Sequence, residues 1–196
     1  MKRDVSKTVS VCYYQLRKLH HLRTLVNQTV LKQVVTLFVL SRIDYCNSLL
    51  INLSTSTTAP LQRVQNDTAR LVLGLDRRAH ITPALKQLHW LPVPYRLQFK
   101  IATLMHQVYH RHCPQYLLNV VSFTTDAARK RLRSTATRAA VSVRRPTRTN
   151  LRRRAFSVAG PSVWNSLPSS LRLIDSHKQF RRQLKTYYFN VAFSYF

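Results

Sequence analysis

Histidine and cysteine side chains gather at one place in the chain, where they could bind a metal ion. His106 and His110 are four residues apart, so they share one face of an expected helix, and His112 and Cys113 follow closely. Imidazole and thiolate groups are the preferred ligands of Zn²⁺. However, the pair lacks the intervening Glu of a metalloprotease helix, and the chain has no paired cysteines. We therefore predict that these residues have structural roles and that the chain binds no metal.

A second group with chemical potential comprises Ser41, Asp44 and Cys46. A nucleophilic site also needs a positioned histidine, and nothing in the sequence places His80 or His89 beside these residues. Capping and turn roles are more common for Ser and Asp. We expect Asp44 to form a local cap or an ion pair with the nearby Arg42. The chain has three cysteines without a CxxC pair, so we expect reduced, mostly buried thiols, with Cys46 in the core.

The third and strongest chemical signal is positive charge. The chain has 32 Lys and Arg against six acids, a formal net charge of +26 and a pI near 11.4. Such a surplus favours polyanions, and nucleic acid is a better candidate than an acidic membrane surface. The predicted nucleic-acid-binding residues are Arg63, Arg70, Arg129, Lys130, Arg131, Arg133, Arg144, Arg145, Arg148, Arg152, Arg153 and Arg154.

The first 120 residues that must position these groups favour helix, because the chain has only two Gly and the apolar residues recur every three or four positions. The predicted helices run from about Val9 to Val26, from an Asn27 cap through Leu40, from Thr58 with Pro60 to Gly74, from Thr82 to His89, and from beyond Pro94 to Val108. The second is so densely apolar that we expect it to be buried. Arg63 and Arg70 lie on the polar face of the third.

The composition changes after Ser122, where basic residues crowd a stretch rich in Thr, Ser and Ala. We interpret residues 122–154 as a basic linker or arm, although the alternation at Ala140–Val143 is compatible with a short strand of a β-hairpin. Ser176 is placed to cap a last helix with Phe180, Leu184 and Tyr188 on one face.

The predicted fold class is therefore mainly α. A small helical bundle spans residues 1–121, the basic arm spans 122–154, and a compact helical and aromatic piece spans 155–196. Trp90 and Trp164 stand in proline-bounded apolar motifs, HWLP and WNSLP, for which core packing is favoured over base stacking. No apolar run approaches the length of a bilayer span, and the N-terminus does not have the pattern of a secretory signal. We expect an intracellular protein without a membrane partner.

Four stretches, in this order, resemble the end of the open reading frame of LINE-type (non-LTR) retrotransposons of the chicken-repeat and jockey-like branches. They are SRIDYCNSLL from Ser41, LQRVQNDTARLVLG from Leu61, HITPALKQLHWLPVPYRLQFKI from His80 and RAFSVAGPSVWNSLPSSLR from Arg154. The resemblance extends roughly from Val9 to Phe189.

This resemblance implies the region after the catalytic palm of a reverse transcriptase, comprising a thumb and a C-terminal extension. A thumb grips template and primer through backbone phosphates. The family's palm carries adjacent Asp residues in a Phe/Tyr-Ala-Asp-Asp motif. This chain has no such motif, no adjacent Asp pair and no Glu. We therefore expect no catalysis by the chain alone and no cofactor in it, whereas the parent RNA-directed DNA polymerase would need Mg²⁺.

The expected function is to hold RNA, an RNA/DNA hybrid or DNA during target-primed reverse transcription, in the nucleus and together with the palm of the parent protein. Two departures from the family pattern indicate drift of an old copy: Asp67 stands in place of a more usual Ala, and the helix before Pro114 ends in HRHCP where the family usually has a small residue such as Gly or Ala. The alternatives are a freestanding basic nucleic-acid-binding structural protein and a decayed open reading frame without function. A hydrolase is disfavoured because no acid and base set converges in the sequence.

Overall fold

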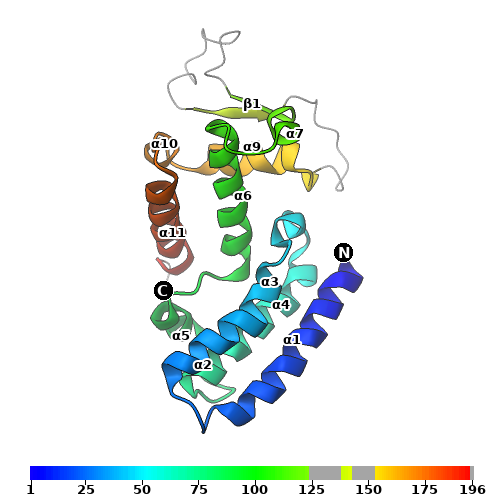
Figure 1. The fold of residues 1–196 in the computed structure, drawn as a ribbon, viewed down its shortest axis with the longest axis vertical. Helices are drawn as coiled ribbons and strands as arrows, with labels where there is room; N and C mark the ends of the chain where they lie inside the picture. The colour runs from blue at the N-terminus through cyan, green and yellow to red at the C-terminus, as the bar shows by residue number, and fades with distance from the viewer. Residues whose placement is uncertain (124–137, 143–152, 195–196) are drawn as a thin grey trace. The chain divides into compact units, whose positions relative to one another are not determined.

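The structure, a computed structural model, describes residues 1–123, 138–142 and 153–194, and these are predominantly helical (Figure 1). The chain forms two compact units. Unit 1 comprises Met1–Arg96 with Ala192–Phe196, and unit 2 comprises Leu97–Val191. The prediction of a mainly α fold is confirmed. Among the described residues, no helix has both the length and the apolar character needed to cross a membrane.

In the described residues of unit 1, all regular secondary structure is helical. Its elements are α1 (Lys2–Leu22), α2 (Gln28–Val35), the π-helix η1 (Thr36–Leu40), α3 (Ser41–Asp44), the 3₁₀-helix η2 (Asn47–Leu50), α4 (Thr55–Leu73), α5 (Ile81–Leu88) and the start of α6 (Val93–Tyr109). α4 is central, because it packs against α1, α2 and α5. The large side chains on its buried face recur at helical spacing, and all five predicted positions are buried: Leu61, Val64, Thr68, Leu71 and Val72.

The sequence predicted the C-terminal end of α4 correctly but not its start. Gly74 ends the helix with a φ of 69°, a left-handed conformation that suits a residue without a side chain, as predicted. The start is earlier than expected. The helix begins at Thr55, so Pro60 lies inside it rather than at its first position. The Ser54 hydroxyl, 2.9 Å from the Thr57 hydroxyl, gives this earlier start a polar contact within the first turn.

The segment from Asn27 to Leu40 begins as predicted but is not fully buried. The Val30 N–H donates to the Asn27 side-chain oxygen at 2.8 Å, which caps α2. Leu31, Val35 and Val39 are buried, whereas Leu37 is 68% exposed and Phe38 is 47% exposed. The expectation of a buried helix was therefore wrong for one face. The density of apolar residues could not show that unit 1 covers only the other face.

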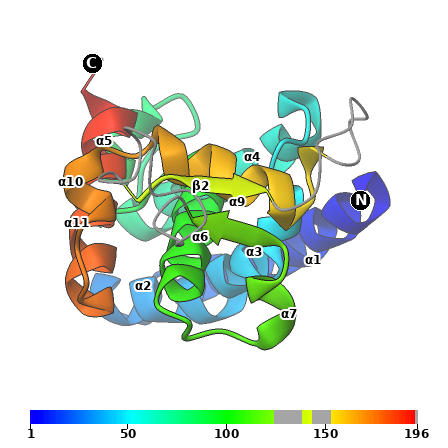
Figure 2. The same ribbon diagram turned by 90° about the horizontal axis from the view of Figure 1, so that it is seen from above.

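Unit 2 adds a two-stranded antiparallel sheet to its helices. Its remaining elements are α7 (Gln115–Leu118), β1 (Val121–Phe123), β2 (Ala140–Ser142), α9 (Phe156–Ser166), α10 (Ser169–Arg172) and α11 (His177–Phe193). Val121 pairs with Ser142 and Phe123 with Ala140. Both strands pack against α9, as Figure 2 shows. The Asn165 side chain of α9 bonds both backbone polar groups of Ala140, at 2.9 and 2.8 Å.

This sheet modifies the prediction for residues 122–154. The strand alternative considered for Ala140–Val143 is correct for Ala140–Ser142, so the part of the arm that the structure describes is docked on unit 2. The predicted boundaries at residues 121 and 154 also differ from the division after Arg96. The sequence change at Ser122 marks a change of composition, whereas the units are divided by packing, and α6 continues from one unit into the other.

Aromatic side chains form the core of unit 2. Trp164 and Phe180 are fully buried, with ring centroids 5.8 Å apart, and the Trp164 indole N–H donates to the Arg138 carbonyl at 2.6 Å. A β-carbon added at Gly160 would lie 2.6 Å from the Met105 sulfur, so this glycine permits a close approach of α9 to α6. Trp90 in unit 1 is also buried, so both tryptophans pack structurally, as predicted.

Replacement of Phe180 by Ala should destabilise unit 2 by about 3–5 kcal/mol, because it removes a fully buried ring from the aromatic core. The matched control is Phe38→Ala, which truncates the same side chain where it is 47% exposed and should cost well under half as much. Urea unfolding followed by tryptophan fluorescence measures both changes. Equal losses for the two variants would contradict this description of the core.

Candidate nucleic-acid interface

A groove in unit 1 brings apolar and basic side chains together. It has a volume of about 410 Å³ and is lined by Tyr13, Leu16, Arg17, His20, His21, Asp67 and Leu71, from α1 and α4. Tyr13, Arg17 and the two histidines share one face of α1, because they are separated by four, seven and eight positions. Leu16 and Leu71 are buried and supply apolar wall. We call this feature the α1–α4 groove.

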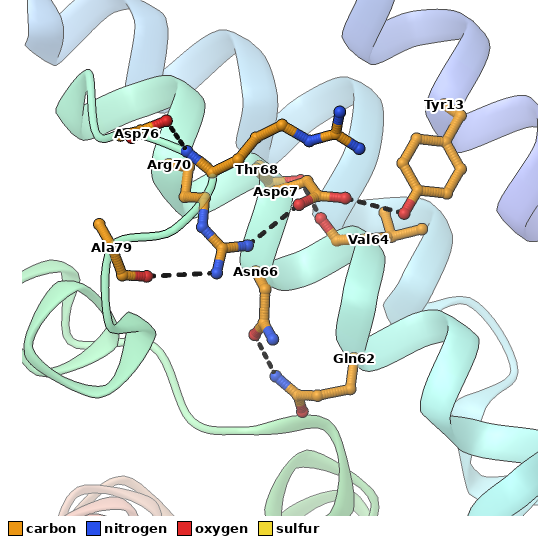
Figure 3. Close-up of polar contacts among 10 residues, drawn as sticks. Tyr13, Gln62, Val64, Asn66, Asp67, Thr68, Arg70, Asp76 and Ala79 are labelled. Carbon is orange, nitrogen blue, oxygen red and sulfur yellow. Dashed lines mark hydrogen bonds and ion pairs between the residues drawn. The ribbon is translucent and has the colours of Figure 1, made fainter.

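Asp67 is the acid of this groove, and two residues fix its carboxylate (Figure 3). The Tyr13 hydroxyl donates to Oδ2 at 2.8 Å, and Arg70 Nη1 donates to Oδ1 at 3.1 Å. Burial and the bond to Asp67 raise the pKa of Tyr13 to about 12, so this phenol is a stable donor. Asp67 therefore links α1 to α4.

The two arginines predicted on the polar face of α4 have different environments. Arg63 is exposed. Its positive charge and that of Arg77 act to lower the pKa of Tyr13, but the larger effect of burial outweighs them. Arg70 is more enclosed, because it also donates through Nη2 to the Ala79 carbonyl at 3.3 Å (Figure 3). Arg63 is thus available to a ligand, whereas much of the hydrogen-bonding capacity of Arg70 is used within unit 1.

Most of the other predicted binding residues lie outside the described residues. These are Arg129, Lys130, Arg131, Arg133, Arg144, Arg145, Arg148 and Arg152, and their role stays a prediction. Arg153 is exposed and Arg154 is half-buried, both just before α9. Arg138, from the same basic stretch, is used internally. Its Nη1 lies 2.8 Å from Asp175, and its guanidinium lies over the Tyr109 ring.

Sequence reasoning missed the basic side of the groove on α1. Arg17, His20 and His21 line it, but only the apolar stripe of this helix was used to predict structure. Tyr13 of the same helix is half-buried at the groove. One sequence signal could have identified these residues. Arg17 is three positions from His20 and four from His21, so the three basic side chains share one helix face.

The histidines considered as zinc ligands take part in packing instead. His106 of α6 is buried and stacks on Phe180 with ring centroids 4.2 Å apart. Its Nε2 lies 2.9 Å from the Ile174 carbonyl, and its Nδ1 lies 3.2 Å from Nδ1 of His177. A carbonyl only accepts, so Nε2 carries the proton, and Nδ1 accepts from His177. In the described part of the chain, no group of three or more His, Cys, Asp or Glu is arranged to hold a metal ion.

The residues considered for nucleophilic chemistry are also used structurally. The Ser41 hydroxyl donates to the Leu37 carbonyl, one helical turn back. Asp44 accepts from Arg96 and from the Asn47 amide, so the expected pairing with Arg42 is replaced by one across 52 residues. Cys46 is exposed in a left-handed conformation, which corrects its assignment to the core, while Cys12 is buried and Cys113 is half-buried.

The buried His106 should make unit 2 less stable in acid. Burial lowers its pKa from 6.5 to about 4, so the unfolded chain takes up a proton first as the pH falls. The resulting stability is present above pH 6.5 and is lost progressively towards pH 4. His106→Gln should reduce this loss by up to about 3 kcal/mol in urea unfolding across that range. The control His20→Gln, at an exposed position on α1, should leave the loss unchanged, and a similar effect of both variants would contradict the assignment.

Comparison with known proteins does not identify a family for this chain. No family model, no curated protein and no solved structure matches the chain.

Proposed function

We propose that this chain is a non-catalytic part of a LINE-type RNA-directed DNA polymerase that grips RNA or an RNA/DNA hybrid through backbone phosphates during target-primed reverse transcription. The four blocks beginning at Ser41, Leu61, His80 and Arg154 support the family, and the net charge of +26 supports the ligand class. In this proposal the palm of the parent protein is the structural partner, the parent supplies the Mg²⁺-dependent chemistry, and the site of action is the nucleus.

The observation that carries the nucleic-acid role is the set of basic side chains at the α1–α4 groove. Arg17, His20 and His21 line it, and the positive charges of Arg63 and Arg77 favour the ionised form of the Tyr13 phenol at this groove. The carboxylate at this surface is already bonded by Tyr13 and Arg70, so it does little to neutralise the surrounding cations. Such a surface attracts phosphates and releases their counterions.

A purely binding role also agrees with how the acids are used. Two-metal nucleotidyl transfer needs carboxylates that converge on the same ions. Here Asp44 pairs with Arg96, Asp67 with Arg70, and Asp175 with Arg138, each in a different place. These acids organise the protein's own cations, which leaves them poorly suited to metal binding.

Affinity for a nucleic-acid oligomer should fall steeply with salt. A plot of log affinity against log salt concentration should be linear, with a slope steeper than about −3, because at least about four phosphates are neutralised. Fluorescence anisotropy of a labelled oligonucleotide measures the slope. A flat response between low and high salt would overturn the proposed function.

The chain alone should also fail to extend a primer. We expect no nucleotide incorporation on a primed RNA template with Mg²⁺ or Mn²⁺, because the sequence has no adjacent Asp pair and no Glu to hold two metal ions. A commercial reverse transcriptase serves as the positive control in the same buffer. Template-dependent extension by the purified chain would exclude a purely binding role.

A further inference from the structure

We infer that the α1–α4 groove binds an unpaired nucleotide of single-stranded RNA, with the base against its apolar wall, phosphates at its basic rim and a ribose hydroxyl at Asp67. This inference rests on the proposed function and specifies which form of nucleic acid this one site takes. Phosphate binding alone does not require a groove, whereas here residues of α1 line one.

The apolar wall is the first argument. Simple phosphate neutralisation needs exposed cations, whereas Leu16, Leu71 and the Tyr13 ring create a recess beneath them. In a duplex the base faces are stacked on each other and cannot enter such a recess. An unpaired base has two free apolar faces, and proteins that bind single strands hold such faces on aromatic or apolar side chains. The recess therefore favours an unpaired strand.

The arrangement of charge is the second argument. Arg17 and the adjacent histidines stand on the α1 side of the groove, and Arg63 stands on the exposed side of α4. A nucleotide seated between the two helices has a phosphate on each side of its sugar. Cations on both helices can thus neutralise consecutive phosphates of the same strand.

Asp67 supplies the third argument and selects RNA. A carboxylate repels phosphate, but it accepts hydrogen bonds from hydroxyl groups. The side chain is 42% exposed, and each of its oxygens accepts one protein hydrogen bond, from Tyr13 or Arg70, which leaves acceptor capacity on both. RNA offers a 2′-hydroxyl donor that DNA lacks. A fixed acid within a basic groove is therefore suited to a ribose and unsuited to a deoxyribose.

The test compares three labelled oligonucleotides of about 12 nucleotides, within the range that single-strand-binding sites cover. They are single-stranded RNA, single-stranded DNA of the same sequence, and the corresponding RNA duplex. Fluorescence anisotropy at one salt concentration should show single-stranded RNA binding about tenfold more tightly than either of the others, the effect of about one well-held nucleotide. Equal affinities would overturn the inference and leave the proposed function intact, whereas absence of all binding would overturn the proposed function itself.

Two groove variants and one control variant localise the effect. Arg17→Glu should weaken single-stranded RNA binding about tenfold, whereas Arg182→Glu, the same charge change at an exposed position on α11, should weaken it by about threefold or less. Asp67→Asn keeps the size of the side chain but removes its charge, and it should abolish most of the preference for RNA over DNA. Equal effects of the two Glu variants would show that only total charge matters.

A measurement on the unmodified chain avoids dependence on the folding of the Asp67 variant. Single-stranded RNA containing thiouridine is crosslinked to the wild-type protein by ultraviolet light, and the adducts are mapped by mass spectrometry. Adducts should occur in α1 at or near Tyr13 and in α4 at or near Leu71. Adducts confined to residues outside unit 1 would overturn the groove assignment.

Discussion

A large excess of positive charge has to be organised by very few acids, and the folded structure depends on how these acids are placed. Each of three ion pairs joins an acid to an arginine: Asp44 to Arg96 across 52 residues, Asp175 to Arg138 across 37, and Asp67 to Arg70 within one helix. Asp67 also receives the Tyr13 hydroxyl from 54 residues away. The pairs of Asp44 and Asp175 and the Tyr13–Asp67 hydrogen bond therefore connect segments that are distant in the sequence, whereas the Asp67–Arg70 pair orients the carboxylate within α4.

The helices were predictable wherever the decisive signal was local. The Asn27 cap and the glycine at position 74 depend on one or two residues, and both behave as expected because capping and left-handed termini are local properties of the backbone. The buried face of α4 followed from periodicity. The exposed face of α2 and η1, with Leu37 and Phe38, did not, because exposure depends on which neighbours cover a helix. The pairing of β1 with β2 joins residues about 20 apart, and no local pattern specifies that partner.

The candidate site could be predicted only in part for the same reason. The sequence indicated Arg63 and Arg70 from their common helix face, but it could not distinguish the exposed guanidinium from the one bonded to Asp67 and Ala79. It gave no indication that Asp67 accepts a hydrogen bond from Tyr13, 54 residues away. Hydrogen-bond partners across helices are set by tertiary packing, so residue type and spacing give candidates and the fold decides their availability.

The count of 32 Lys and Arg consequently overstates the number of cations that can meet a ligand. Arg70, Arg96 and Arg138 are held by carboxylates. An arginine paired with a carboxylate still contributes to the electrostatic potential around the protein. Salt screens this potential beyond about one Debye length, near 10 Å at 0.1 M. Only a cation with free donors adds the short, directional contacts that give one surface an advantage over another. Within unit 1, exposed side chains such as Arg63 meet that condition beside the α1–α4 groove. Under the proposed function we therefore expect this groove, more than total charge, to determine where a strand is held.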